Sequence, residues 1–378
     1  MRVNPTRTYP TRLGSQTCQM LARDRIGSAS MRVIHSSGTP SARGEAVGIA
    51  LRSEIEASVS FTMAWAADLG ADRRRVEAML VPYDDATERY APDLAEVLDG
   101  MARGSGVDPV ALRATNAFEE LYALLDPSAM GAPVERCTDA LLTGADGPIL
   151  VHQEQWYAAD ADSIAIVVDR PDDAVAVVAP VVASGLPLVG MNATGASVGA
   201  MSLTATDERS GVPRMIVARR ALDARDRAEA WRTVTTSERA GGYSYSFAFA
   251  GGATALFETT ATTAADLRGT VHSNHAIDDT VASICPSASD GSISRFARMR
   301  ELTAERDTWT IADACSLLAD HGADGQDICV HPDPAEGPES SAIMFGMVAD
   351  VANRTLWVAP GNPCLNRFEP YPLDELIA

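Results

Sequence analysis

The stretch that decides the fold lies about a third of the way along the chain and reads Pro133-Val134-Glu135-Arg136-Cys137-Thr138-Asp139-Ala140-Leu141-Leu142. A single cysteine there begins a short run typical of a β-strand. A cysteine is a good nucleophile only as its thiolate, and its free pKa is about 8.5. Its own α-amino group, with a pKa of roughly 7.7–8.0, is a base that becomes available only when the preceding peptide bond is cut. We therefore predict self-cleavage between Arg136 and Cys137, with Cys137 as nucleophile.

The character of the chain changes at Cys137. Before it, one short strand (31–35) precedes helical patterns over 43–69, 71–80, 93–99 and 108–125. After it, short apolar runs separated by Gly, Asp and Pro indicate strands over 138–143, 149–155, 163–168, 174–182, 243–249, 254–259, 328–330, 340–350 and 355–359. Helical patterns return over 222–235, 292–305 and 311–321. Strands and helices in separate blocks favour an α+β layered domain.

The domain prediction has three parts. Residues 1–30 are expected to be a disordered or non-native extension, with Met31 as an alternative start. Residues 31–136 form an α piece and residues 137–378 a β piece, and the two pieces together make one domain. The competing interpretation of Cys137 is that it is a small buried apolar residue without a catalytic role, because most cysteines outside disulfides are of that kind.

Composition narrows the possible partners. The chain has 378 residues and a net charge of −20, which argues against a nucleic acid as main partner. No apolar run reaches the roughly 20 residues of a membrane helix. The six cysteines are widely spaced and include no Cys-x-x-Cys pair, so we expect reduced thiols and a cytoplasmic protein. His272 and His275, followed by two aspartates, make only a weak metal site.

Eight blocks resemble, in order, the motifs of the acyl-coenzyme A:isopenicillin N acyltransferase family. Together they extend roughly from Val33 to Cys364. The blocks are residues 38–48, residues 100–107, Asn116-Ala117-Phe118-Glu119, Cys137-Thr138, His152-Gln153-Glu154-Gln155-Trp156, Gly190-Met191-Asn192, His272-Ser273-Asn274-His275 and Gly361-Asn362-Pro363-Cys364.

The resemblance implies an N-terminal-nucleophile hydrolase fold, a four-layer αββα sandwich with two stacked antiparallel sheets. It implies a precursor that cuts itself into α and β pieces, the second beginning with Cys137. It also implies an amidase or acyltransferase that forms an acyl thioester on Cys137 and passes the acyl group to an amine or to water. The donor would be a small-molecule amide or an acyl thioester, carried by coenzyme A or a carrier protein. No cofactor and no metal are implied.

The resemblance also assigns roles at the site. Asn274 matches the oxyanion-hole asparagine, and a preorganised amide N–H there stabilises developing negative charge. Asn192 is a second candidate polar group, and the backbone N–H at Gln155 is a further donor. Arg295 is a candidate anchor for an acyl group or carboxylate, although it also fits a solvated helix face. Asp139 is placed with the substrate-binding residues.

Two positions depart from the family pattern. Gln155 stands where the family has an aspartate, and Asp139 stands where it has a small hydroxyl residue. The lost charge at 155 and the carboxylate at 139, which would either replace that charge or hinder thiolate formation, motivate an alternative in which the fold binds a small molecule or partner without turnover. A third hypothesis keeps the chain uncut, with His152 or Asp139 activating Cys137.

Overall fold

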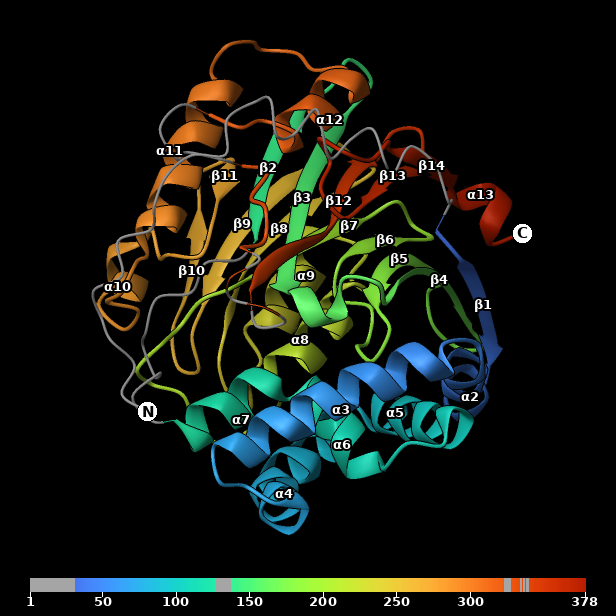
Figure 1. Ribbon diagram of the computed structural model, residues 1–378. Helices are drawn as coiled ribbons and strands as arrows, with labels where there is room; N and C mark the ends of the chain where they lie inside the picture. The colour runs from blue at the N-terminus through green and yellow to red at the C-terminus, as the bar shows by residue number, and fades with distance from the viewer. Residues whose placement is uncertain (1–30, 127–136, 323–327, 334, 336, 338–339) are drawn as a thin grey trace.

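The computed structural model describes residues 31–126, 137–322, 328–333, 335, 337 and 340–378 (Figure 1). The predicted cleavage bond lies outside these residues on its Arg136 side, and so does the whole predicted extension 1–30. No helix of the described segments is long and apolar enough to cross a membrane.

One sheet has eight strands in the order β1–β4–β5–β6–β7–β8–β9–β10. The expectation of purely antiparallel sheets is wrong at one pair, because β1 runs parallel to β4. This edge strand comes from the segment before Cys137, whereas the others follow it. The strands are β1 (Val33–Gly38), β4 (Ile164–Pro171), β5 (Val177–Val182), β6 (Gly190–Asn192), β7 (Ser197–Ser202), β8 (Tyr243–Ala248), β9 (Thr254–Thr259) and β10 (Ala264–Leu267).

The second sheet has six antiparallel strands in the order β11–β2–β3–β12–β13–β14. Its central strands, β3 and β12, are ten residues each and form the longest ladder of the fold. The strands are β2 (Thr138–Thr143), β3 (Pro148–Tyr157), β11 (Val271–His272), β12 (Ser341–Asp350), β13 (Thr355–Pro360) and β14 (Glu369–Pro372).

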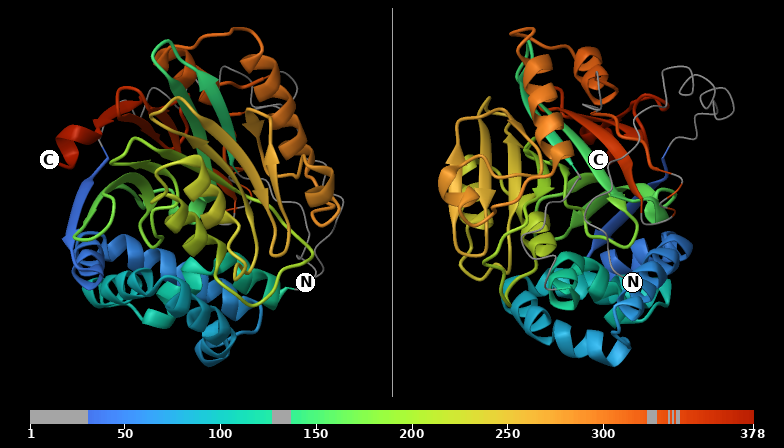
Figure 2. Two further views of the ribbon diagram at one scale, coloured as in Figure 1. Left: turned by 180° about the vertical axis from the view of Figure 1, so that it is seen from behind. Right: turned by 60° about the vertical axis from the view of Figure 1, so that its left-hand side comes forward.

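The sheets stack face to face, with β2 and β3 lying against β7 and β8. Helices α8 (Arg214–Ala221) and α9 (Arg227–Val234) cover the eight-stranded sheet (Figure 2). Trp231 of α9 packs there on Phe257, with ring centroids 5.1 Å apart. Helices α11 (Asp290–Thr303) and α12 (Ile311–Leu318) cover the six-stranded sheet through a separate apolar cluster. The order helix, sheet, sheet, helix confirms the αββα sandwich and the α+β class.

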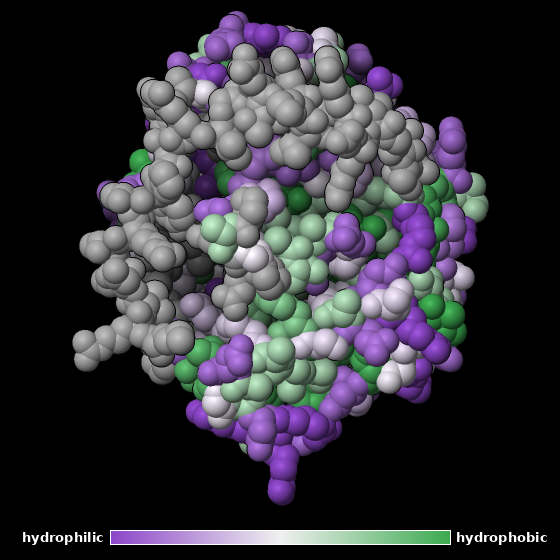
Figure 3. Space-filling view, in the orientation of Figure 1, coloured by the Kyte–Doolittle hydropathy of each residue, from purple (hydrophilic) through white to green (hydrophobic). Residues whose placement is uncertain are grey.

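The helices before Cys137 form a further group at one end of the sandwich (Figure 1). In the space-filling view, hydrophilic side chains gather over the lower tip, where α4 lies, and apolar ones are nearer the middle of this face (Figure 3). This group comprises α2 (Pro40–Ala50), α3 (Arg52–Asp68), α4 (Arg73–Tyr90), α5 (Pro92–Ser105), α6 (Pro109–Asn116) and α7 (Phe118–Leu125). Buried residues of this group belong to the same apolar core as strands of both sheets.

Helices α2 and α5 cross with their backbones in contact. A Cβ added at Gly44 would lie 2.0 Å from the carbonyl oxygen of Val97, and one at Gly48 would lie 2.3 Å from that of Met101. The expectation that a helix stops at Gly100 is therefore wrong. Helix α5 continues to Ser105, and Gly100 is a contact residue whose added Cβ would lie 2.4 Å from the carbonyl oxygen of Ser41.

Three other sequence predictions differ from the structure. The helix expected over 222–235 is α9, which begins later, at Arg227. The preceding helix α8 was not predicted, because its arginines interrupt the apolar pattern. Residues 328–330 are not a strand, since their backbone groups pair with loops and side chains. Strands β10 and β14 are only four residues each, too short for a period-2 pattern to stand out.

We expect the substitution Gly48→Ala to lower stability by about 1–3 kcal/mol, because the new methyl group meets a backbone atom that cannot rotate away. The control is Gly251→Ala, where an added Cβ has no atom within 4 Å. Urea unfolding followed by circular dichroism measures both. A Gly48→Ala midpoint equal to that of Gly251→Ala would contradict the close crossing.

Candidate active site

Cys137 lies directly before β2 and is buried, with 3% of its surface exposed. Strand β2 pairs with β3 in a register that sets Thr138 opposite Gln153 and Asp139 opposite His152. Alternate residues of a strand point to the same face. Cys137 and Asp139 therefore share one face with His152 and Glu154 of the neighbouring strand.

These four side chains form a continuous chain of polar contacts. The Sγ of Cys137 donates to Oε1 of Glu154 at 3.5 Å. The other oxygen of Glu154 lies 3.1 Å from Nε2 of His152, and Nδ1 of His152 lies 2.6 Å from Oδ1 of Asp139. The nucleophile predicted from sequence is thus connected through a carboxylate and an imidazole to a second carboxylate.

The ring of His152 is positively charged at neutral pH. Burial by itself would lower its pKa, because burial disfavours a charged ring. The carboxylate of Asp139 and then that of Glu154 outweigh burial and raise the pKa to about 9. An imidazolium cannot accept a proton, so His152 is unsuited to act as the base for Cys137. Its effect is to hold and orient the carboxylate of Glu154.

Asp139 ends this series of polar contacts and is not among the residues that line the pocket. It is fully buried, and Gly199 of β7 makes room for it, since a Cβ there would lie 2.3 Å from Oδ2 of the aspartate. Asp139 is absent from the pocket lining, so the contact with substrate that we expected for it is not present. Its contact is with His152, whose charge it balances.

A pocket opens at Cys137 and encloses about 710 Å³, including its solvent-open mouth. Its wall is mostly apolar, with Glu154, Ser202 and Tyr243 among its few polar side chains. A mostly apolar lining with a few polar groups is typical of small-molecule sites. The apolar side chains of the wall are those of Trp156, Pro180, Val181, Val182, Leu186, Leu188, Val189, Ala200, Met215 and Phe345.

The Asn116-Ala117-Phe118-Glu119 block frames this pocket from the helical side. Asn116 donates to the carbonyl oxygen of Ser184 at 2.8 Å and accepts from the backbone N–H of Leu186 at 3.0 Å. Glu119 accepts from Ser202 Oγ at 2.6 Å and from the hydroxyl of Tyr243. The α piece therefore fixes the pocket wall although its side chains do not contact Cys137 in any of these bonds.

Arg295 connects Thr138, the neighbour of Cys137, to the predicted oxyanion residue Asn274. Its Nε donates to Thr138 Oγ1 at 3.1 Å, and its Nη2 donates to Asn274 Oδ1 at 3.0 Å. The side-chain NH₂ of Asn274 then donates to the carbonyl oxygen of Ser202, a pocket residue, at 3.2 Å. Arg295 is only 2% exposed, so it orients Asn274 and is not an open anchor for a substrate carboxylate.

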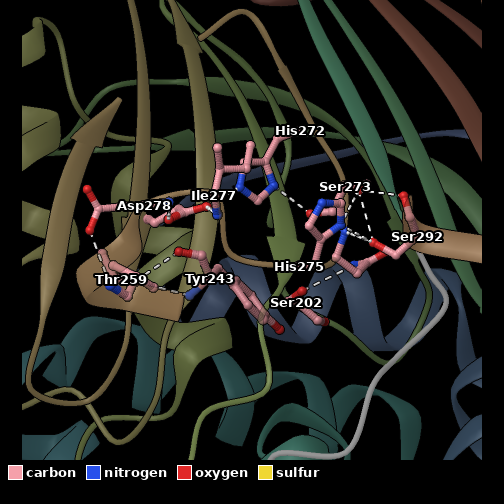
Figure 4. Close-up of polar contacts among 12 residues, drawn as sticks. Ser202, Tyr243, Thr259, His272, Ser273, His275, Ile277, Asp278 and Ser292 are labelled. Atoms are coloured by element: carbon pink, nitrogen blue, oxygen red, sulfur yellow. Dashed lines mark hydrogen bonds and ion pairs between the residues drawn. The ribbon is translucent and has the colours of Figure 1, made fainter. Parts of the chain in front are cut away.

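The loop that carries Asn274 is held by neighbouring polar groups. Ser292 Oγ accepts from the backbone N–H of Asn274 at 2.9 Å and contacts Ser273 Oγ and His275 Nδ1 (Figure 4). His272 Nε2 lies 2.6 Å from Oε1 of Glu258. Both histidines therefore take part in hydrogen bonds, and these contacts hold Asn274 in a fixed position.

Two predicted catalytic residues lie elsewhere. The side chain of Gln155 points to the opposite face of β3 from Glu154 and donates to Ser341 Oγ at 2.9 Å. Asn192 donates to the carbonyl oxygens of Leu222 and Ala224, both at 2.9 Å, and is fully buried. Neither side chain lines the pocket, so neither is brought to Cys137.

Glu154 is the residue that sequence reasoning missed. The family pattern predicts a carboxylate at position 155, where this chain has Gln155, and the neighbouring Glu154 was not considered. The sequence does carry a signal for Glu154. Cys137-x-Asp139 lies on one strand and His152-x-Glu154 on the next, and the alternation of side chains along a strand allows all four to lie on one face. Glu154 supplies a carboxylate at the sulfur in place of the charge missing at Gln155, and Asp139 contacts His152, so neither departure favours the non-catalytic alternative.

The same site could bind a metal ion. The donor atoms of Cys137, His152 and Glu154 lie within 4.8 Å of one another. A metal there would require His152 to lose its proton, against the two carboxylates that stabilise it. We therefore interpret the three groups as an acid–base arrangement.

Comparison with known proteins gives one family. A model of the family described as "Acyl-coenzyme A:6-aminopenicillanic acid acyl-transferase" matches residues 142–364, well over half of the chain. The match includes Glu154, Asn274 and Arg295 and begins just after Cys137. No curated protein matches the sequence.

Solved structures of similar shape include two named enzymes. A mutant of conjugated bile acid hydrolase from Clostridium perfringens has 10% identity and a TM-score of 0.47, covering 64% of this chain and 94% of that one. Penicillin V acylase from Agrobacterium tumefaciens has 14% identity and a TM-score of 0.42, covering 59% and 83%. Likeness this distant says nothing about substrate.

We expect His152 to make stability depend on pH. Its folded pKa is raised from 6.5 to about 9, so its contribution is fully present below pH 6.5 and is lost as pH rises through about 9. The raised pKa corresponds to about 3 kcal/mol. Unfolding free energies across this range should fall more steeply for the unaltered chain than for His152→Gln. Parallel curves would show that His152 does not titrate there.

Proposed function

Because the chain belongs to the acyl-coenzyme A:6-aminopenicillanic acid acyl-transferase family, we propose that it is a self-processing enzyme with Cys137 as its N-terminal nucleophile. The family makes it an enzyme that acts on amide bonds, as an acyltransferase or a hydrolase. The proposal adds cleavage between Arg136 and Cys137, a thioester on Cys137, and an apolar acyl group as substrate.

The observation that carries the proposal is the position of Cys137, which lines a mostly apolar pocket and has its Sγ 3.5 Å from a carboxylate of that pocket. A buried structural cysteine needs neither feature. Cys285 illustrates the contrast, since it is buried in an apolar cluster and burial raises its pKa to about 12.

The balance of charge favours an N-terminal nucleophile. Asp139 and Glu154 carry two negative charges in contact with His152, whose ring carries one positive charge. One negative charge remains beside the sulfur, and it opposes ionisation of the thiol. A neutral α-amine on Cys137, released by cleavage, would serve as the base and take the thiol proton. The α-ammonium group that results would pair with Glu154 beside the thiolate.

Cleavage and turnover use the same attack. In maturation the sulfur attacks the carbonyl carbon of Arg136, the C–N bond breaks, and water hydrolyses the resulting thioester to leave a free α-amine. In turnover the sulfur attacks a substrate carbonyl, and the thiol proton passes through the α-amine to the departing amine nitrogen. Water or a second amine then attacks the thioester, and its proton returns to the sulfur.

Asn274 supports the negative oxygen that forms during each attack. Its NH₂ is directed toward the pocket wall at Ser202, and Arg295 fixes the other end of its amide. Removal of one such donor typically costs about 10²–10³ in kcat. The backbone N–H near Gln155 remains the proposed second donor.

The pocket suggests the acyl group. Its aromatic and aliphatic wall fits an apolar acyl chain or ring, because burial of such surface contributes about 25 cal/mol per Å². The substrate is proposed to be a small-molecule amide or an acyl thioester on coenzyme A or a carrier protein. The acceptor is an amine or water.

We expect intact mass under denaturing conditions to show two pieces for the unaltered chain, the second beginning with Cys137. Cys137→Ala should give one uncut, inactive chain, because both bond cleavages need the sulfur. The control Cys315→Ser alters a half-buried cysteine on α12 and should be cut normally. An active Cys137→Ala variant would remove the assignment of the nucleophile.

A separate measurement distinguishes cleavage from turnover. Brief reaction with an apolar acyl thioester should add the acyl mass to the β piece, at Cys137 in a peptide map. An uncut chain that still gains this mass would keep the nucleophile and reject the N-terminal amine as its base.

We expect Glu154→Gln to lower kcat/KM of the cut enzyme by up to about 10²–10⁴, the range for loss of a general base, because it removes the charge that holds the α-amine, which is the base. Glutamine keeps the shape but loses the charge that would pair with the α-ammonium. Glu96→Gln, on the exposed face of α5, is the matched control. A full rate in Glu154→Gln would show that its carboxylate is dispensable.

A further inference from the structure

A second cluster of reactive side chains lies outside the pocket. His321, Cys329, His331 and Cys364 each bring one nitrogen or sulfur atom within 4.8 Å of the others. None of them takes part in the contacts of Cys137 described above. Two imidazoles and two thiols form one of the ligand sets found in structural zinc sites.

We propose that these four side chains bind a structural zinc ion. Zinc bonds of about 2.0–2.3 Å in a tetrahedron place the ligand atoms about 3.3–3.8 Å apart. The sulfur of Cys364 already lies 3.3 Å from Nε2 of His331. The rings of His321 and His331 lie against each other, with centroids 5.2 Å apart and an angle of 21° between them. Only small side-chain movements separate this arrangement from a complete coordination shell.

The surroundings of the cluster fit a metal better than plain packing. Nε2 of His321 is buried and has no hydrogen-bond partner among the described residues, a costly state for a polar atom. The side-chain NH₂ of Asn362 donates to Cys329 Sγ at 3.5 Å. N–H groups directed at ligand sulfur are the outer contacts that metal sites use to orient and tune their ligands.

The charge balance is complete with a divalent ion. Zinc replaces two thiol protons, one from Cys329 and one from Cys364, and both histidines bind as neutral rings. Two thiolates and one Zn²⁺ sum to zero, so no charge remains uncompensated in the half-buried cluster. Four protein ligands leave no open position, which marks a structural rather than a catalytic ion.

The zinc would join two loops behind the catalytic strand. His321, Cys329 and His331 lie between α12 and β12, and Cys364 follows β13. The carbonyl oxygen of Ile328, next to Cys329, accepts from Gln153 at 2.6 Å. Gln153 lies on β3 between His152 and Glu154, and its side chain points away from the pocket. The metal would therefore brace the outer face of the strand whose inner face holds Glu154.

The competing state is a disulfide between Cys329 and Cys364, which would remove both sulfur ligands. The sulfurs are present as thiols in the structure. After denaturation and removal of any metal, the chain with two thiols is heavier by two hydrogen atoms than the chain with the disulfide and has two more reactive thiols, so one measurement separates them.

The test is metal analysis of the full chain, purified without a histidine tag and without chelator. We expect about one zinc per chain, as four ligands of this kind hold one ion. The variants His331→Gln and Cys364→Ser should lose it. His331 is exposed, so its change is the less disturbing to packing. Two controls should keep the zinc: Cys315→Ser, a thiol outside the cluster, and Cys137→Ser, which removes a ligand of the possible site in the pocket.

Cobalt provides a measurement that needs no variant. Co²⁺ exchanged into the unaltered chain should show the visible bands of a tetrahedral ion and the near-ultraviolet band of cobalt–thiolate bonds. Zinc absent from the unaltered chain together with no cobalt–thiolate band would overturn the proposal. So would a disulfide joining Cys329 to Cys364, or zinc lost in Cys137→Ser but kept in His331→Gln. None of these outcomes bears on whether Cys137 is cut or acylated.

Discussion

The pairing of β2 with β3 is the constraint on which the site depends. Its register sets Asp139 opposite His152, and strand alternation then brings Cys137 and Glu154 to the same face. A slip of one residue would turn His152 and Glu154 to the outer helices and leave Cys137 beside the glutamines. The long ladder between β3 and β12 holds β3 in place from its other side. The pairing of the backbones therefore decides which side chains can meet at Cys137.

The position of Cys137 at the start of the sheets could be predicted from the sequence, because the signal lies in neighbouring residues. Cys137 stands at a change from helical to strand patterns, and that change is a real boundary between the helical group and the two sheets. Arg295 and Asn274 could be named as site residues but not given their roles, because their contact joins α11 to a loop twenty-one residues earlier. Contacts of that kind depend on how elements pack, which periodicity does not record.

Gln155 and Glu154 show the limit more sharply. The motif comparison directed attention to one position and its missing charge, while the neighbouring position supplied a carboxylate on the correct face. At Gly100 a helix end was predicted where the helix continues. A glycine commonly ends a helix, but here its missing side chain lets two helices touch, and sequence alone does not distinguish the two uses. Asn192 was chosen for its polarity at a strand end, and its bonds to Leu222 and Ala224 show a residue that closes a turn.

Strand β1 gives the fold a property that follows from its origin. It comes from the segment before Cys137, yet it forms the edge of the sheet through its parallel pairing with β4, and helices α2 and α5 share the core of that sheet. A cut at Cys137 would leave the two pieces bound by these contacts without a covalent link. Unfolding of the cut protein would then separate two molecules, so its recovery would depend on concentration, unlike that of the precursor. A protein built in this way folds once as a single chain, and afterwards its lifetime is governed by the rate at which it comes apart.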